Sequence, residues 1–226
     1  TKEELSGCGY TTRGIVNCFM REEIWRQLNA RFYDSNAEML DAQYETMDKR
    51  GDAVRDTMQL EALDTALLEK MEVLAGSLAP MYEADSHAIA IVVNVDDYGK
   101  PEQWEYYPAV GEAFSVVYAD GGELIDRRIG ESADRSTPGE DIELRLLGER
   151  EVTYTVCALV NLPYAMGYRY YMPGYCGILP VEAFRQDSGQ QAIPLFYLFD
   201  TPDAEAEAQA ESYLSHLTGK EQTNLM

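Results

Sequence analysis

The chain has 226 residues, of which 46% are apolar and 11% aromatic, so it can bury the core of one large domain or two small subdomains. Its 40 acidic residues against 18 basic residues give a net charge of −22, which repels phosphate backbones and anionic lipid headgroups. The composition argues against wholesale disorder and nucleic-acid binding, and it favours basic partners. Acidity that serves only solubility explains the charge equally well.

The first third of the chain predicts one strand followed by helices. Residues 11–20 are β-branched and apolar, as in a strand, whereas residues 21–51 lack internal Gly and Pro and repeat apolar residues at helical spacing. Residues 56–74 predict a further helix, because Leu60, Leu63, Leu67, Met71 and Leu74 fall on one helical face. Gly76 is expected to end that helix.

The remainder predicts mainly strands. Residues 88–95 form an apolar run typical of a strand buried on both faces, and residues 96–101 read as a turn. Asp120-Gly121-Gly122 predicts a hairpin-like turn, residues 130–141 a loop, and residues 148–150 a polar turn. Further strands are expected at 110–118, 124–129, 142–147, 152–160, 178–184 (or an extended entry to a helix) and 194–200.

The last predicted element is a helix at residues 203–217, with Thr201 at the N-cap and Pro202 at the first helical position. The expected fold class is therefore α+β. A mainly helical segment (20–78) is inserted after the first strand of a β-rich body (1–19 plus 79–226), and a C-terminal strand and helix pack back against that first strand. We expect residues 1–226 to form one domain, with these two parts as subdomains.

The four cysteines, Cys8, Cys18, Cys157 and Cys176, form no C-x-x-C pair, so the sequence supports no zinc site. Cys157 lies among strand residues and is expected to be a buried small hydrophobe. A disulfide between Cys8 and Cys18, or between Cys176 and another cysteine, remains open if the domain faces an oxidising space.

A tyrosine-rich segment is the best candidate for partner contact. Gly167 and Gly174 allow the segment to bend, and Tyr and Met side chains suit adaptable contact surfaces. Rings that simply cover the end of the sheet are the simpler explanation, with partner binding as the alternative. The side chains concerned are those of Tyr164, Met166, Tyr168, Tyr170, Tyr171, Met172 and Tyr175.

The sequence predicts no catalytic residue, no metal ligand and no cofactor. It contains neither a G-x-x-x-x-G-K-[ST] loop nor a G-x-S-x-G elbow, and His87 and His216 lie far apart. Residues 94–105 faintly echo a calcium loop but fit a solvated turn better. A solvated face is also the better explanation for the clustered acids Glu102, Glu105, Asp120, Glu123 and Asp126.

The order of several short motifs resembles the extracytoplasmic domain of FtsX/MacB-type ABC transporter permeases, of the Gram-positive subtype. A Val-Leu-x-Gly step precedes a buried strand, and the later motifs follow over roughly residues 60–217. They are Val110-Gly111-Glu112-Ala113-Phe114-Ser115-Val116, Tyr154-Thr155-Val156-Cys157-Ala158-Leu159-Val160, the segment from Leu179 to Phe184, and the helix from Asp203 to Leu214.

The resemblance implies a fold like the MacB periplasmic core domain and a domain that does no chemistry. It implies a cytoplasmic ATPase subunit as partner of the full-length permease, an extracellular peptide, lipid or protein as a further partner, and a place on the outer side of the cell membrane. The sequence shows no signal peptide and no run of about 20 apolar residues, and its start without Met and abrupt end lead us to expect a piece of a longer protein. The resemblance implies that this longer protein is a membrane protein.

Such an insertion between two membrane helices predicts chain ends that lie close together. The alternative function is a secreted acidic module that captures cationic ligands, as the net charge of −22 and the tyrosine-rich segment would allow.

Overall fold

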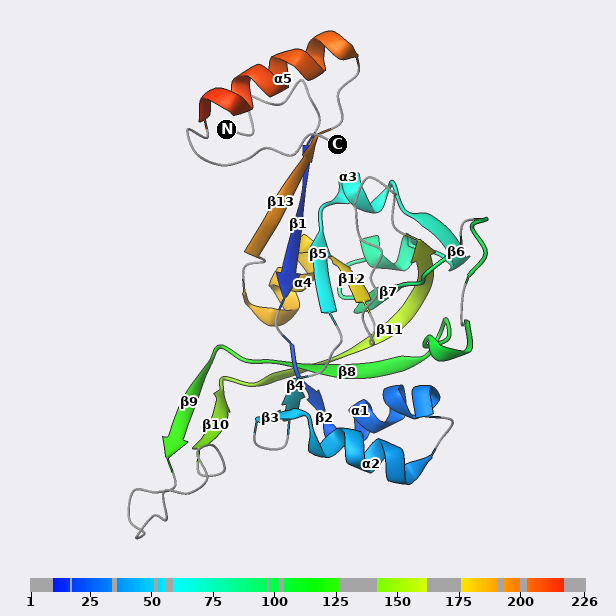
Figure 1. Cartoon of the computed structure of the whole chain (residues 1–226), viewed down its shortest axis with the longest axis vertical. Coiled ribbons are helices and arrows are strands. Elements are labelled where there is room, and N and C mark those ends of the chain that lie inside the picture. The colour runs from blue at the N-terminus through cyan, green and yellow to red at the C-terminus, as the bar shows by residue number, and fades with distance from the viewer. Residues whose placement is uncertain are drawn as a thin grey trace.

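A computed structural model describes residues 10–16, 18–33, 36–50, 53–55, 59–96, 98–101, 104–126, 142–161, 176–190, 193–199 and 203–217. The fold is α+β, as the sequence predicted (Figure 1). The strands are β1 (Tyr10–Val16), β2 (Met20–Arg21), β3 (Asp48–Arg50), β4 (Ala53–Arg55), β5 (Gln59–Leu63), β6 (Glu72–Gly76), β7 (Ala88–Val92), β8 (Ala113–Tyr118), β9 (Gly121–Asp126), β10 (Ile142–Leu147), β11 (Arg150–Asn161), β12 (Cys176–Pro180) and β13 (Ile193–Phe199). The helices are α1 (Glu22–Asn29), α2 (Ala37–Glu45), α3 (Thr65–Leu68), α4 (Val181–Ser188) and α5 (Ala204–Leu217), and the 3-10 helices are η2 (Ala30–Tyr33), η3 (Ala79–Tyr82) and η4 (Trp104–Tyr106).

The centre of the molecule is a mixed eight-stranded sheet in the order β13-β1-β5-β12-β7-β11-β6, with β8 also paired to β11. The pairs β5–β12 and β7–β11 are parallel, and the other pairs of this sheet are antiparallel. Two smaller sheets, β2-β4-β3 and β9-β10, lie beyond β8 (Figure 1).

The central strands β5, β7 and β12 of the main sheet are buried on both faces. Ile89 and Ile91 of β7 point into a core shared with α1, α2 and α4, whereas Ala90 and Val92 point into a second core that includes side chains of α3 and η3. This two-sided burial explains the uninterrupted apolar run of β7, and it confirms the prediction of a strand buried on both faces.

The first predicted strand is divided in two. β1 ends at Val16, and Phe19 then forms two backbone hydrogen bonds with Val117 of β8, of 2.8 and 2.7 Å, before β2 begins. The helical segment expected next, of one or two helices, is present as α1 and α2. The chain therefore leaves the main sheet after β1, builds the helical part at its far end, and returns in β5 (Figure 1).

The predicted helix at residues 56–74 is wrong, and with it the boundary of the helical segment at residue 78. Residues 59–63 are strand β5, only Thr65–Leu68 form a turn of helix, and residues 72–76 are strand β6. β5 lies between β1 and β12, so Leu60 and Leu63 are both fully buried although they face opposite sides of the sheet. Their spacing imitates one face of a helix because each face of the strand carries a buried leucine.

Gly76 has a structural role different from the predicted helix cap. Its φ is +76°, and a Cβ added there would overlap the carbonyl oxygen of Cys157 in β11 and lie 3.1 Å from the Cα of Ala158. The glycine therefore allows the close approach of β6 to β11 that closes one edge of the sheet.

The Gly121-Gly122 turn is also corrected. Both glycines are the first residues of β9, and they pair with Leu147 and Leu146 of β10.

The residues expected at the N-cap and at the first position of the C-terminal helix, Thr201 and Pro202, lie outside the described residues. The observed cap is Asp203, whose Oδ1 accepts the backbone N–H of Ala206 at 2.8 Å.

The other strand predictions hold within a few residues, at β8, β10, β11, β12 and β13. The predicted loop at 130–141 lies outside the described residues. No helix in the described part of the chain is long and apolar enough to cross a membrane.

Candidate functional site

The tyrosine-rich segment predicted as a contact surface lies outside the described residues, so its role stays a prediction. This applies to Tyr164, Met166, Tyr168, Tyr170, Tyr171, Met172 and Tyr175. Cys8 also lies outside the described residues, so a Cys8–Cys18 disulfide stays a prediction as well. Cys157 is buried and free, and burial raises the pKa of its thiol to about 11, which fits the small hydrophobe expected there.

One end of the main sheet brings the first and last strands together. β1 and β13 are antiparallel neighbours, with Tyr10 opposite Phe199 and Thr11 opposite Leu198. Neighbouring strands lie about 4.8 Å apart, so the chain enters β1 and leaves β13 at adjacent points. Helix α5 follows and lies beyond this same end of the sheet (Figure 1). The predicted packing of the C-terminal strand on the first strand is therefore confirmed.

A chain of polar side chains runs from the surface into the core on the α4 side of the sheet. The hydroxyl groups of Tyr118 and Tyr154 are 2.7 Å apart, and the Tyr154 hydroxyl donates to Oδ2 of Asp187 at 2.8 Å. His87 Nδ1 lies 3.1 Å from Oδ1 of the same carboxylate. A phenol has one proton, so Tyr118 donates to Tyr154 and Tyr154 donates to Asp187.

The exposure of these side chains changes sharply along the network. Tyr118 and Tyr154 are fully buried and the Asp187 side chain is 5% exposed, whereas the His87 side chain is 44% exposed. Burial raises the pKa of both tyrosines well above the usual value, so neither phenol can act as a base near neutral pH. The arrangement orients the His87 imidazole at the surface. Sequence reasoning had treated His87 as an isolated surface residue and missed its partner.

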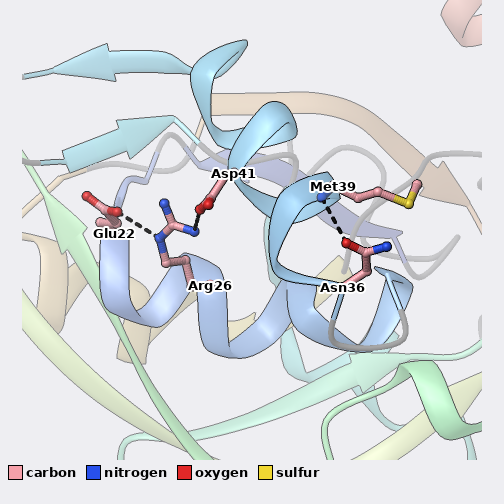
Figure 2. A network of polar contacts seen from close by, with 5 residues as sticks. All are labelled: Glu22, Arg26, Asn36, Met39 and Asp41. Carbon is pink, nitrogen blue, oxygen red and sulfur yellow. Dashed lines mark hydrogen bonds and ion pairs between the residues drawn. The ribbon is translucent and has the colours of Figure 1, made fainter.

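The helical part is fixed by ionic contacts that face one another across α1 and α2 (Figure 2). The Arg26 guanidinium binds Oε1 of Glu22 at 2.7 Å and Oδ1 of Asp41 at 2.6 Å. Its carbon atom also lies 4.8 Å from the ring centre of Tyr44. The Asn36 side chain accepts the backbone N–H of Met39 and thereby caps α2 (Figure 2). Of these contacts, those of Arg26 with Asp41 and with Tyr44 join α1 to α2.

Aromatic side chains are exposed where η2 approaches η4. The rings of Phe32 and Tyr106 stack with centres 5.5 Å apart, and Trp104 begins the same turn as Tyr106. Phe32 is 36% and Trp104 41% exposed. We call these three residues the η2–η4 aromatic surface. The spacing of Trp104 and Tyr106 gave no sequence signal, because their stacking partner comes from a distant segment.

Two of the five clustered acids, Glu105 and Asp120, have described side chains, and both are exposed, as a solvated face predicts. Glu105 is exposed on η4, and Asp120 forms an ion pair with Arg150. Glu102 and the side chains of Glu123 and Asp126 lie outside the described part. Within the described ranges, no group of three or more metal-ligating side chains occurs.

The segment that echoed a calcium loop is a turn, as expected. Val95 and Pro101 form an isolated β-bridge, and the Asp96 backbone N–H donates to the carbonyl of Lys100 at 2.8 Å. The Asp96 carboxylate accepts the backbone N–H groups of Tyr98 and Lys100, at 2.9 and 2.8 Å. The carboxylate is thus used to shape the turn.

No protein-family model matches the chain, and no curated protein matches it significantly.

Proposed function

We propose that this domain is a non-catalytic extracytoplasmic domain of an FtsX/MacB-type ABC transporter permease. In this role it couples ATP hydrolysis in a cytoplasmic subunit to an extracellular substrate or partner. The observation that carries the proposal is the pairing of Tyr10 with Phe199, which sets the start of β1 beside the end of β13; helix α5 (Ala204–Leu217) follows and lies beyond the same end of the sheet (Figure 1). A domain inserted between two membrane helices needs its entry and exit side by side, because packed helices lie only 8–10 Å apart.

The chemistry of the described side chains supports a non-catalytic role. Asp120 is neutralised by Arg150, and Glu112 by Arg31. The buried tyrosine hydroxyl groups are used within the fold. The exposed His87 is held by an ion-pair contact with Asp187. The function is therefore expected to depend on rigid-body movement of the domain relative to its membrane helices.

The test is the location of the domain in intact cells that produce the full-length protein. Tyr98 is 95% exposed, so a Tyr98→Cys variant presents a reactive thiol, whereas Cys157 is buried. We expect a membrane-impermeant maleimide to label the variant in intact cells. The labelled protein should stay in the membrane fraction and co-purify with an ATP-hydrolysing subunit. The unsubstituted protein is the control for labelling at native cysteines.

Two results would overturn the proposal. Labelling only after lysis would place the domain inside the cell. Recovery of the labelled protein from the medium, with no membrane-bound form, would favour the secreted module for cationic ligands instead.

A further inference from the structure

The η2–η4 aromatic surface rests on a rigid support. Glu112 lies between η2 and the start of β8, where it accepts hydrogen bonds from Arg31 and from the backbone N–H of Ala109, the latter at 3.1 Å. The Tyr107 hydroxyl, next to η4, accepts the backbone N–H of Asn94 at 3.2 Å. These contacts tie Arg31 and Tyr107, the chain neighbours of Phe32 and Tyr106, to the body of the domain, and the rings of Phe32 and Tyr106 restrain each other by stacking. Such restraint before a partner arrives lowers the entropic cost of binding.

The charges around this surface favour a cationic partner. Arg31 and Arg26 are neutralised by carboxylates of the domain itself. Glu38 in the first turn of α2 and Glu105 in η4 are exposed, and neither forms an ion pair with another described residue. Lys100 is an exposed base on the neighbouring turn. With a net charge of −22 on the whole chain, the long-range field draws in cations.

The aromatic faces add a second attraction for the same class of partner. Indole and phenol rings bind ammonium and guanidinium groups over their faces and bury aliphatic side chains against their edges. Trp104, Tyr106 and Phe32 therefore suit a ligand that carries both basic and apolar groups.

We propose that the η2–η4 aromatic surface docks a short peptide that carries both basic and apolar side chains. The carboxylates of Glu38 and Glu105 attract its basic groups, and the three rings bury its apolar groups. This proposal does not rest on the permease assignment, since the surface lies on a different part of the fold from the paired ends of β1 and β13.

The experiment uses the fluorescence of Trp104. The chain has two tryptophans, and Trp25 is only 1% exposed against 41% for Trp104, so changes at the surface report on Trp104. The probe is a synthetic amphipathic peptide of lysine and leucine, titrated at low and at high salt. We expect a saturable blue shift of the emission, protection from acrylamide quenching, and weaker binding at high salt.

Two variants and one matched control separate docking from unfolding. Phe32→Ser should weaken binding about tenfold, as expected for an aromatic anchor. Glu105→Lys reverses an exposed charge without touching the core and should weaken binding and reduce its salt dependence. Leu147→Ser removes a side chain of similar exposure (44%) on β10 and should leave binding unchanged.

Each other outcome overturns the proposal. Equal binding of a glutamate–leucine peptide would show that the acidic side chains do not attract the ligand. Equal effects of Phe32→Ser and Leu147→Ser on binding would show that the peptide does not bind at the η2–η4 aromatic surface. The same emission shift with phosphatidylcholine vesicles would indicate a membrane contact. A dimer that Phe32→Ser dissociates would indicate a second copy of the chain. If the lysine–leucine peptide changes neither the emission of Trp104 nor its quenching, the surface does not dock a peptide with basic and apolar side chains.

Discussion

Two glycines with the same backbone conformation offer a direct test of how β6 meets β11. Gly76 and Gly99 both have φ of +76°, but an added Cβ at Gly99 meets no atom within 4 Å, whereas at Gly76 it overlaps the carbonyl oxygen of Cys157. That oxygen also accepts the backbone N–H of Ser77 at 2.9 Å. Gly76→Ala and Gly99→Ala thus share the conformational strain and differ in the collision.

The two costs follow from separate terms. A left-handed conformation costs an L-residue about 1–2 kcal/mol, and the stiffer unfolded chain of alanine returns about 0.4–1 kcal/mol. Gly99→Ala should therefore lower the free energy of unfolding by about 1 kcal/mol. At Gly76 the strands must also move apart, and loss of the Ser77–Cys157 hydrogen bond adds about 1–3 kcal/mol. The expected total for Gly76→Ala is about 2–4 kcal/mol.

Equilibrium urea unfolding followed by far-ultraviolet circular dichroism measures both variants against the parent domain. Equal losses of stability would refute the reasoning. They would mean that Gly76 occupies an open position, such as the end of a helix, rather than a crossing of two strands.

Two further predictions concern titratable groups. Tyr154→Phe removes two hydrogen bonds, one of them to the Asp187 carboxylate, and should lower the free energy of unfolding by about 2–4 kcal/mol, against about 1 kcal/mol for Tyr118→Phe. Burial raises the pKa of both tyrosines above that in the unfolded chain, so their contribution to the free energy of unfolding is fully present below about pH 10 and is lost above it. Urea unfolding across this range should therefore show a steeper alkaline loss of stability in the parent than in the variant that carries both Tyr118→Phe and Tyr154→Phe. Burial opposes ionisation of Glu112, but hydrogen bonds from Arg31 and the Ala109 backbone hold its pKa below the usual 4.5, so Glu112→Gln should flatten the loss of stability as the pH falls below that value. An unchanged acid profile for Glu112→Gln would contradict this assignment.

The sequence was a reliable guide wherever a strand had one clear signature. β7 combines β-branched residues with a strand-length apolar run, and β13 precedes a helix that begins with acidic residues. The segment of β5 was wrongly predicted as helix because this strand lies in the middle of the sheet, where both of its faces are covered. Leu60 and Leu63, on opposite faces, are three residues apart, which is also the spacing along one face of a helix. Hydrophobic periodicity alone cannot distinguish these cases, since only tertiary pairing decides which faces are covered.

The polar network was not predicted from the sequence. Tyr118 and Tyr154 lie in segments predicted as strands, but no pattern there indicates that their hydroxyl groups meet. Asp187 and His87 gave no signal either. Each comes from a segment with no motif, and only the packing of α4 against the sheet brings them together.

The two proposals meet in the path of β1. This strand starts beside the end of β13 and ends at Val16; the chain then passes the isolated bridge between Phe19 and Val117 and leads through β2 into α1 and η2. The helices α1 and α2 lie at the opposite end of the longest axis of the molecule from α5 (Figure 1). A peptide that docks on η2 would therefore bind far from the paired ends, on an element that the chain reaches from β1 through an isolated bridge and β2. The labelling experiment and the Trp104 titration test the two proposals separately.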